Sequence, residues 1–416
     1  MTKRGHEFIV SLVLALYIIA AVAFECTANT ARISTIGIYL VFVIGSIYLI
    51  FTGQFHINEH CICMLLLLVY IYIMSLFNRN ALSDTVAYYY FTCTVLCLIS
   101  YNLYISIDRE KISTVCLLAF ILGSLILAIR IIFSYGGFSA MIEFASSGVH
   151  ERRVGGEFLN ENTFGLYMVN AFFCCLVLFG RLKTKWYLLS ISLLLISPLF
   201  VVMLLLSASK KAILYLLFGF VILILFFFHK YQGGRKVFIL LTTIAGIAFI
   251  YYIIMNMPAF RSVRLRFIDL FNFLEDNSAG STADIGRANM ISTGLSVFLD
   301  SPIFGNGTAF SFTLFGTYSH NNFVELLMNY GIIGFSIYYF RYIILFPRLV
   351  TLSRDGDIYA VWFLIFVLMQ IVLGIAWVNY YERITQLLTI IAVGYSETMS
   401  QESISVKNTC KYLKNP

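Results

Sequence analysis

The chain passes from a polar loop into an apolar helix at residues 319–335, which read SHNNFVELLMNYGIIGF. A histidine, two adjacent asparagines and a glutamate stand where the backbone enters lipid. Moving such groups out of water costs several kcal/mol unless they have partners or line a polar cavity. The stretch therefore predicts a functional site at one end of a membrane-spanning helix.

Composition places the rest of the chain in the membrane as well. Of the 416 residues, 60% are hydrophobic and only 12% are charged, whereas soluble domains carry about 25% charged residues. Apolar runs of about 17–25 residues recur along nearly the whole length, as spanning helices require. We expect an all-α polytopic membrane protein, because a β-barrel would show short alternating segments instead.

About twelve spans are predicted, and together they form a single integral membrane domain over residues 1–416. No internal repeat or soluble domain interrupts them. The expected spans are 8–24, 33–52, 61–77, 85–107, 112–133, 163–180, 186–207, 212–229, 237–255, 323–346, 358–378 and 384–396.

The distribution of Lys and Arg predicts the orientation. The first apolar run follows Lys3 and Arg4, and because so many spans follow it we expect an uncleaved signal-anchor. Short loops on one side collect most of the basic residues, and the positive-inside rule assigns that side to the cytoplasm. Both termini are then cytoplasmic, with residues 397–416 as a polar cytoplasmic tail. Residues 134–162 and 256–320 become two outer loops.

The cysteines do not indicate a disulfide framework or a metal centre. Most of the nine fall inside or at the ends of apolar runs, where cysteine behaves as a small hydrophobic residue. The segment from His56 to Cys63 is dense in ligand-type residues, but no second ligand pair follows it. An interfacial turn followed by packing cysteines is the preferred interpretation, and we expect no metal.

The two outer loops carry arginine and no lysine. The planar guanidinium binds phosphate oxygens in pairs and keeps its charge, so these residues suit a lipid-linked phosphate or pyrophosphate. The alternative is that they pair with nearby carboxylates or with lipid headgroups. In the longer loop, residues 260–273 and 285–298 predict amphipathic helices against the membrane surface. The arginines are Arg152, Arg153, Arg261, Arg264, Arg266 and Arg287.

His320 is the candidate general base, because histidine gains and loses a proton near neutral pH. The alternative is an interfacial or capping role. Asn321 and Asn322 can cap the following helix. Glu325 can orient His320 or act as the base itself.

Two further polar junctions precede apolar runs. Residues 152–162 read RRVGGEFLNEN, where the glycines permit close backbone approach and Asn160 and Asn162 can bind sugar hydroxyls or cap a helix. Residues 207–211 read SASKK and contribute Lys210. Their alternative interpretation is a simple hairpin turn between helices.

Four features, in this order, resemble the O-antigen polymerase and O-antigen ligase superfamily (Wzy-type). They are Arg-x-Gly-x-x-x-x-Asn-x-Asn from Arg153, a Ser-x-Ser-Lys turn from Ser207, Arg287 leading into SPIFGNG at residues 301–307, and the His320-Asn321 block with Glu325. The resemblance covers about residues 150–335. Lys210 departs from the pattern, since arginine is usual there.

The resemblance implies a GT-C-like glycosyltransferase that acts on undecaprenyl-pyrophosphate-linked sugars at the outer face of the bacterial inner membrane. We expect Arg287, His320 and Glu325 to be catalytic residues. The expected substrate-binding residues are Arg152, Arg153, Asn160, Asn162, Lys210, Arg261, Arg264 and Asn321. No cofactor is needed, because the pyrophosphate already activates the sugar. The implied partners are a lipid-linked donor and acceptor, the bilayer and a chain-length regulator protein, and no nucleic acid.

Three functions remain open from the sequence. A polymerase would join repeat units of an O-antigen, capsule or exopolysaccharide and is the preferred interpretation. A ligase would transfer the glycan to lipid A–core. A flippase for lipid-linked oligosaccharides is the alternative of another class, but transporters tend to place charges in mid-helix, and here the polar residues gather in the outer loops.

Overall fold

The structure is a computed structural model that describes residues 3–25, 30–53, 55–78, 81–147, 153–155, 160–184, 186–230, 232–275 and 282–397. Every regular element in these ranges is helical, which confirms the all-α fold. In lipid each backbone N–H and C=O needs a partner within the protein, and a helix supplies it within one segment. Arg152 and the expected tail beyond residue 397 lie outside the described residues.

Ten helices in these ranges are long and apolar enough to cross a membrane, two fewer than the twelve spans predicted. The last two predicted spans are shorter helices. α15 ends at Leu373 rather than at residue 378, and the final helix covers 383–397. The 16 residues of α15 reach about 24 Å at ~1.5 Å per residue, less than the ~30 Å of a hydrocarbon core. Non-helical backbone follows Gly374, although residues 375–378 are apolar.

The chain divides into two compact units. Unit 1 comprises Met1–Leu14, Ile38–Ser113 and Arg287–Pro416, and unit 2 comprises Ala15–Gly37 and Thr114–Gly286. Four helices continue from one unit into the other along the chain. They are α1 (Lys3–Phe24), α2 (Ala31–Thr52), α5 (Arg109–Ser134) and α12 (Thr282–Asp300).

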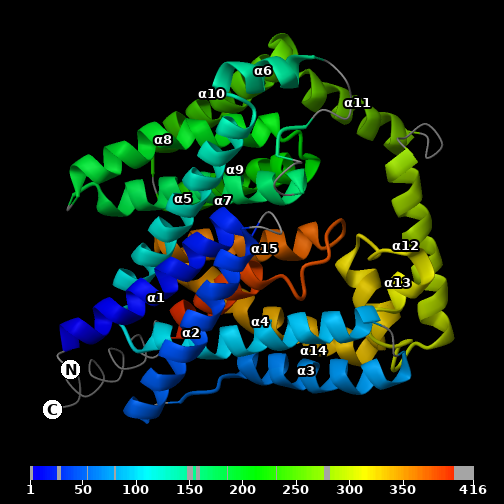
Figure 1. The fold of residues 1–416 in the computed structure, drawn as a ribbon. Helices are drawn as coiled ribbons and strands as arrows, with labels where there is room; N and C mark the ends of the chain where they lie inside the picture. The colour runs from blue at the N-terminus through cyan, green and yellow to red at the C-terminus, as the bar shows by residue number, and fades with distance from the viewer. Residues whose placement is uncertain are drawn as a thin grey trace. The chain divides into compact units, whose positions relative to one another are not determined.

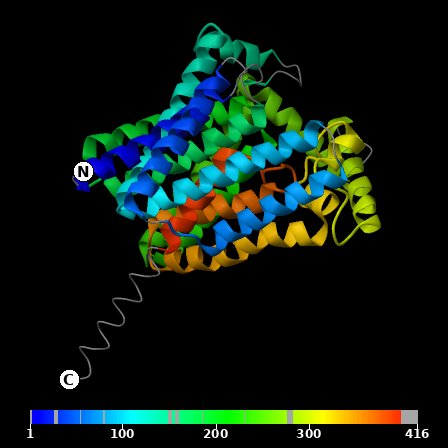
Figure 2. The ribbon, with the colours of Figure 1, turned by 60° about the horizontal axis from the view of Figure 1, so that its bottom comes forward.

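In unit 1, α3 packs against α4 and α14, and α14 also contacts α13 and α15. Figures 1 and 2 show α3 and α14 side by side. The core is rich in polar groups: Arg341 is buried against the rings of Tyr338 and Tyr342, and its Nη1 lies 3.3 Å from Nε2 of His60. The helices are α3 (Glu59–Phe77), α4 (Ala81–Ile105), α13 (Phe310–Phe315), α14 (Asn322–Arg354) and α15 (Ile358–Leu373).

In unit 2, α7 packs along α8 and α9, and α9 contacts α10, as Figure 1 shows. The short α6 and η1 contact each other and α11, and α11 also touches α8 and α9. The helices that the sequence predicts within 260–273 and 285–298 are present in α11 and α12. The remaining helices are α6 (Phe138–Ser146), α7 (Glu161–Leu182), α8 (Tyr187–Leu206), α9 (Lys210–Lys230), α10 (Gly234–Asn256), η1 (Pro258–Phe260) and α11 (Arg261–Glu275).

Candidate functional site

Some candidate residues belong to unit 1 and others to unit 2. Those in unit 1 are Arg287, His320, Asn321 and Glu325, and those in unit 2 are Arg153, Asn160, Asn162, Lys210, Arg261 and Arg264.

Gly331 breaks α14 one short segment after its start. Its φ of +61° and ψ of −165° are not helical, so backbone groups on both sides of the break lose their partners within the helix. The loop before α13 supplies replacements. The Asn306 N–H donates to the Met328 carbonyl at 3.0 Å, and the Ile332 N–H donates to the Pro302 carbonyl at 2.9 Å. The SPIFGNG motif is therefore the backbone partner of the broken helix.

Glu325 is the centre of a buried hydrogen-bond network in the short first segment of α14. Only 1% of Glu325 is exposed. Its carboxylate accepts from the Ser311 hydroxyl at 2.5 Å, the Asn329 amide at 3.1 Å and the Ser319 N–H at 2.7 Å. Hydrogen bonds of this kind offset the desolvation of a buried carboxylate. Glu325 thus fixes the loop residue that directly precedes His320, through its backbone.

His320 adopts a left-handed backbone conformation with φ of +59°, which is uncommon for a residue with a Cβ. Its half-buried ring faces Tyr318, with the two ring centroids 4.2 Å apart. Burial raises the pKa of the Tyr318 phenol, the Arg287 guanidinium opposes that rise, and the Glu325 carboxylate adds to it. Arg287 thus lies within electrostatic range of Tyr318, whose ring contacts that of His320.

Asn321 and Asn322 hold the start of α14. Asn321 is the N-cap, and its Oδ1 accepts from the N–H groups of Phe323 and Val324. Asn322 instead reaches the segment after α15: its N–H donates to the Gly374 carbonyl at 2.7 Å, and its Oδ1 accepts from the Asn379 N–H at 3.1 Å. Asn321 therefore caps α14, which is one of the roles that the sequence suggested for it. Asn322 anchors the non-helical backbone that ends α15 early.

One residue of this segment, Tyr381, lies near the site without having been predicted. Tyr381 lies within electrostatic range of Glu325 and Tyr318. Arg383 follows two residues later, with its guanidinium carbon 4.9 Å from the ring centroid of Tyr89. The sequence did contain a signal, because YYER at 380–383 stands between two predicted spans, 358–378 and 384–396.

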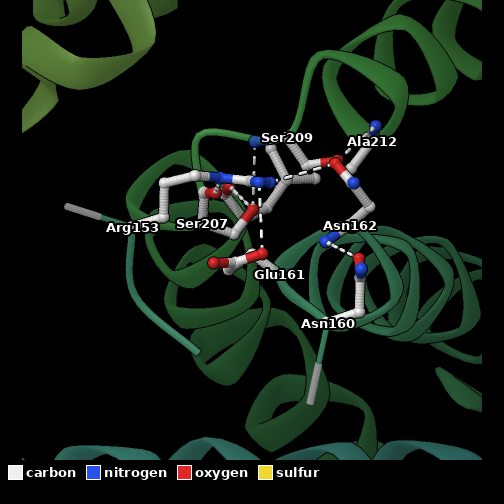
Figure 3. Close-up of polar contacts among 8 residues, drawn as sticks. Arg153, Asn160, Glu161, Asn162, Ser207, Ser209 and Ala212 are labelled. Carbon is white, nitrogen blue, oxygen red and sulfur yellow. Dashed lines mark hydrogen bonds and ion pairs between the residues drawn. The ribbon is translucent and has the colours of Figure 1, made fainter. Parts of the chain in front are cut away.

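In unit 2, Arg153 links two loops (Figure 3). Its Nε donates to the Ser207 carbonyl at 3.0 Å, one terminal nitrogen pairs with Glu161 at 3.1 Å, and the other donates to Asn162 at 3.0 Å. The side chain is only 10% exposed. A phosphate would have to displace these partners. Arg153 therefore pairs with a carboxylate of the protein, which is the alternative to phosphate binding that the sequence left open.

The two asparagines of this junction also have partners within the chain. Asn160 is the N-cap of α7, and its Oδ1 accepts from the Asn162 N–H at 2.9 Å. The Oδ1 of Asn162 accepts from Arg153 and from the Ser209 hydroxyl, which lies 3.1 Å away (Figure 3). A Cβ at Gly165 would lie 2.7 Å from the Ser207 hydroxyl oxygen, so only glycine permits this close approach.

Unit 2 holds three other basic candidates, Lys210, Arg261 and Arg264. Lys210 is half-buried at the first position of α9, directly after Ser209. α11 packs its buried Val263 inward while Arg261 stays exposed. Arg264 donates to the Met255 carbonyl. α11, which carries both arginines, contacts α8 and α9.

Comparisons with known proteins agree with this organisation. The comparison with curated proteins finds no match. The family model described as O-antigen ligase (Wzy_C) matches residues 193–339, a range that includes the Ser207 turn, Arg287, the docked loop and the His320–Glu325 network. Over these residues the chain is similar to the O-antigen polymerase and ligase superfamily.

Proposed function

We propose that this protein is a polysaccharide polymerase that joins undecaprenyl-pyrophosphate-linked repeat units at the outer face of the inner membrane. The observation that carries the proposal is His320 against Tyr318 on a loop that Glu325 holds in place, with Arg287 of α12 within electrostatic range of Tyr318. A base beside a permanent cation is the pair of groups that glycosyl transfer from a pyrophosphate requires.

In the proposed reaction the oxygen of the acceptor hydroxyl bonds to the anomeric carbon of the donor. His320 takes the proton of that hydroxyl in the same step. The bond between that carbon and the pyrophosphate oxygen breaks, and the lipid pyrophosphate leaves with the electron pair. Arg287 stabilises the negative charge that develops on the leaving group. Direct displacement of this kind inverts the anomeric centre. The donor supplies the activation, so neither a nucleotide sugar nor a metal is required.

The Glu325 network supports this assignment by fixing the base. Glu325 binds the Ser319 N–H, and Asn321 caps the helix on the other side of His320. A base held from both sides has little freedom to leave the geometry needed for proton transfer, which is a condition for efficient catalysis. Glu325 is therefore proposed as a positioning residue rather than as the base.

The second candidate is an O-antigen ligase, which the description of the matching family model favours. Ligase and polymerase share the donor and differ in the acceptor, which is lipid A–core for the ligase. The same residues would carry either reaction.

Purified protein in liposomes with lipid-linked repeats distinguishes these functions. A ladder of products from lipid-linked repeats alone is the expected result for a polymerase. Transfer only when lipid A–core is added would identify a ligase. Translocation of the lipid-linked glycan without any new glycosidic bond would contradict both and support a flippase.

A further inference from the structure

An apolar groove lies between α9 and α10 in unit 2, close to where α9 ends and α10 begins. Its volume is about 510 Å³, within the range of about 300–1,000 Å³ typical of ligand pockets. α7 contributes Leu176 to the wall. Most of the remaining lining consists of the apolar and aromatic side chains of the two flanking helices, including Phe220, Phe227, Phe238 and Ile239.

Basic side chains gather at one end of this groove. Arg235 lines it directly. Lys230 ends α9 and Lys236 lies in the first turn of α10, next to Arg235 in the chain, and their Nζ atoms lie 5.4 Å and 6.0 Å from the ring centroids of Phe226 and Phe228. The sequence contains no aspartate or glutamate between Glu161 and Asp269. Arg235, Lys230 and Lys236 therefore belong to a long stretch of the chain that carries basic but no acidic residues.

α10 leaves the groove available to a lipid. None of the 23 residues of α10 is buried in the protein, although the helix is long and apolar enough to span a membrane. A hydrocarbon chain is the partner that such a surface accepts in a bilayer, and basic pockets between membrane helices bind anionic headgroups.

We propose that the groove binds an anionic phospholipid. One acyl chain lies between α9 and α10, and the phosphate rests on Arg235 with Lys230 and Lys236 beside it. This site differs from the Arg153 junction. The groove begins at Phe220 on α9, about ten residues after Lys210, which is roughly 15 Å at ~1.5 Å per residue. The proposal does not depend on the proposed function.

Lipid binding to the purified full-length protein tests this proposal. The protein in detergent is titrated with phosphatidylglycerol, phosphatidylcholine or undecaprenyl phosphate, and bound lipid is measured by native mass spectrometry. The variants are Arg235→Ala, the triple alanine variant of Lys230, Arg235 and Lys236, and Thr243→Trp, which fills the groove with a bulky ring. Arg354→Ala is the matched control, because Arg354 is an exposed arginine at the end of α14.

We expect the wild type and Arg354→Ala to bind phosphatidylglycerol more tightly than phosphatidylcholine. Each basic residue contributes about 5-fold in affinity at a membrane surface. Arg235→Ala should therefore bind about 5-fold more weakly and the triple variant about 100-fold more weakly, and Thr243→Trp should lose the bound lipid. Equal binding of both phospholipids, unchanged binding in the variants, or preferential binding of undecaprenyl phosphate would each overturn the proposal. A thermal unfolding scan in the same detergent confirms that the variants are folded.

Discussion

Gly305 and Gly331 approach so closely that neither position has room for a Cβ atom. A Cβ at Gly305 would lie 2.5 Å from the Gly331 nitrogen, and a Cβ at Gly331 would lie 2.3 Å from the Ile303 carbonyl oxygen. Both glycines also have positive φ. This contact holds the loop that leads to α13 against the break in α14, and it thereby sets where the His320 segment begins.

Gly331→Ala and Gly305→Ala should each destabilise the protein and reduce activity. The left-handed conformation alone costs roughly 1–2 kcal/mol for a residue with a Cβ, and the clash with backbone atoms adds to it. Thermal unfolding in detergent measures the effect. Gly246→Ala is the control, since a Cβ there meets nothing within 4 Å and alanine favours a helix. Unchanged stability of both site variants would mean that the loop contact is not tight in solution.

His320→Ala should reduce polymerisation by about 10²- to 10⁴-fold, the usual contribution of a general base. Folding should persist, because Asn321 rather than His320 caps α14. Product length and rate in the liposome assay measure the loss. Near-normal polymer from a folded His320→Ala variant would remove the residue from the mechanism.

Glu325→Gln should harm activity less than His320→Ala but should lower stability. The amide cannot accept from all three donors that the carboxylate now binds, and an unsatisfied buried donor costs about 1–3 kcal/mol. A pH–rate profile distinguishes a general base from a positioning residue. If Glu325 only positions His320, the Glu325→Gln variant still shows the pKa of the general base in its profile. An inactive but stable Glu325→Gln variant, beside an active His320→Ala, would make Glu325 the base.

Arg287→Ala should abolish product, and Arg287→Lys should restore little of it. A lysine supplies a point charge, whereas the guanidinium fork holds two phosphate oxygens at once. Steady-state rates on lipid-linked repeats give the comparison, with Arg354→Ala as the control for loss of a surface arginine. Full activity in Arg287→Lys would show that binding two phosphate oxygens at once is not needed.

Arg153→Ala should lower stability more than it affects the chemical step. Its partners Glu161 and Ser207 connect the start of α7 to the turn before α9. A double-mutant cycle with Glu161→Ala, read by thermal unfolding, should give a coupling of about 0.5–3 kcal/mol. No coupling, together with a large rise in KM for the lipid-linked donor, would instead support direct phosphate binding by Arg153.

Polymerisation should continue in the presence of a chelator such as EDTA. The proposed reaction assigns the stabilisation of the leaving pyrophosphate to arginine, so no divalent cation is required. The assay compares product ladders with and without chelator, using a metal-dependent glycosyltransferase as the control. Loss of product on chelation with recovery on adding magnesium or manganese would contradict the arginine-based mechanism.

The sequence by itself determined that this is an all-helical membrane protein. Hydrophobicity over windows of about twenty residues is a local property, and lipid permits each such window only one ordinary backbone solution, a helix. For the same reason the polar residues at 319–325 were conspicuous, since each has to be satisfied at the membrane.

Only the tertiary structure decided which partner each polar group has. Arg153 and Arg287 carry the same guanidinium, yet Arg153 is held by Glu161, Asn162 and Ser207, while Arg287 lies near Tyr318. These partners come from segments that folding brings together, and no local pattern encodes them. The early end of α15 has the same origin, because Asn322, on another helix, binds the backbone at Gly374 and Asn379.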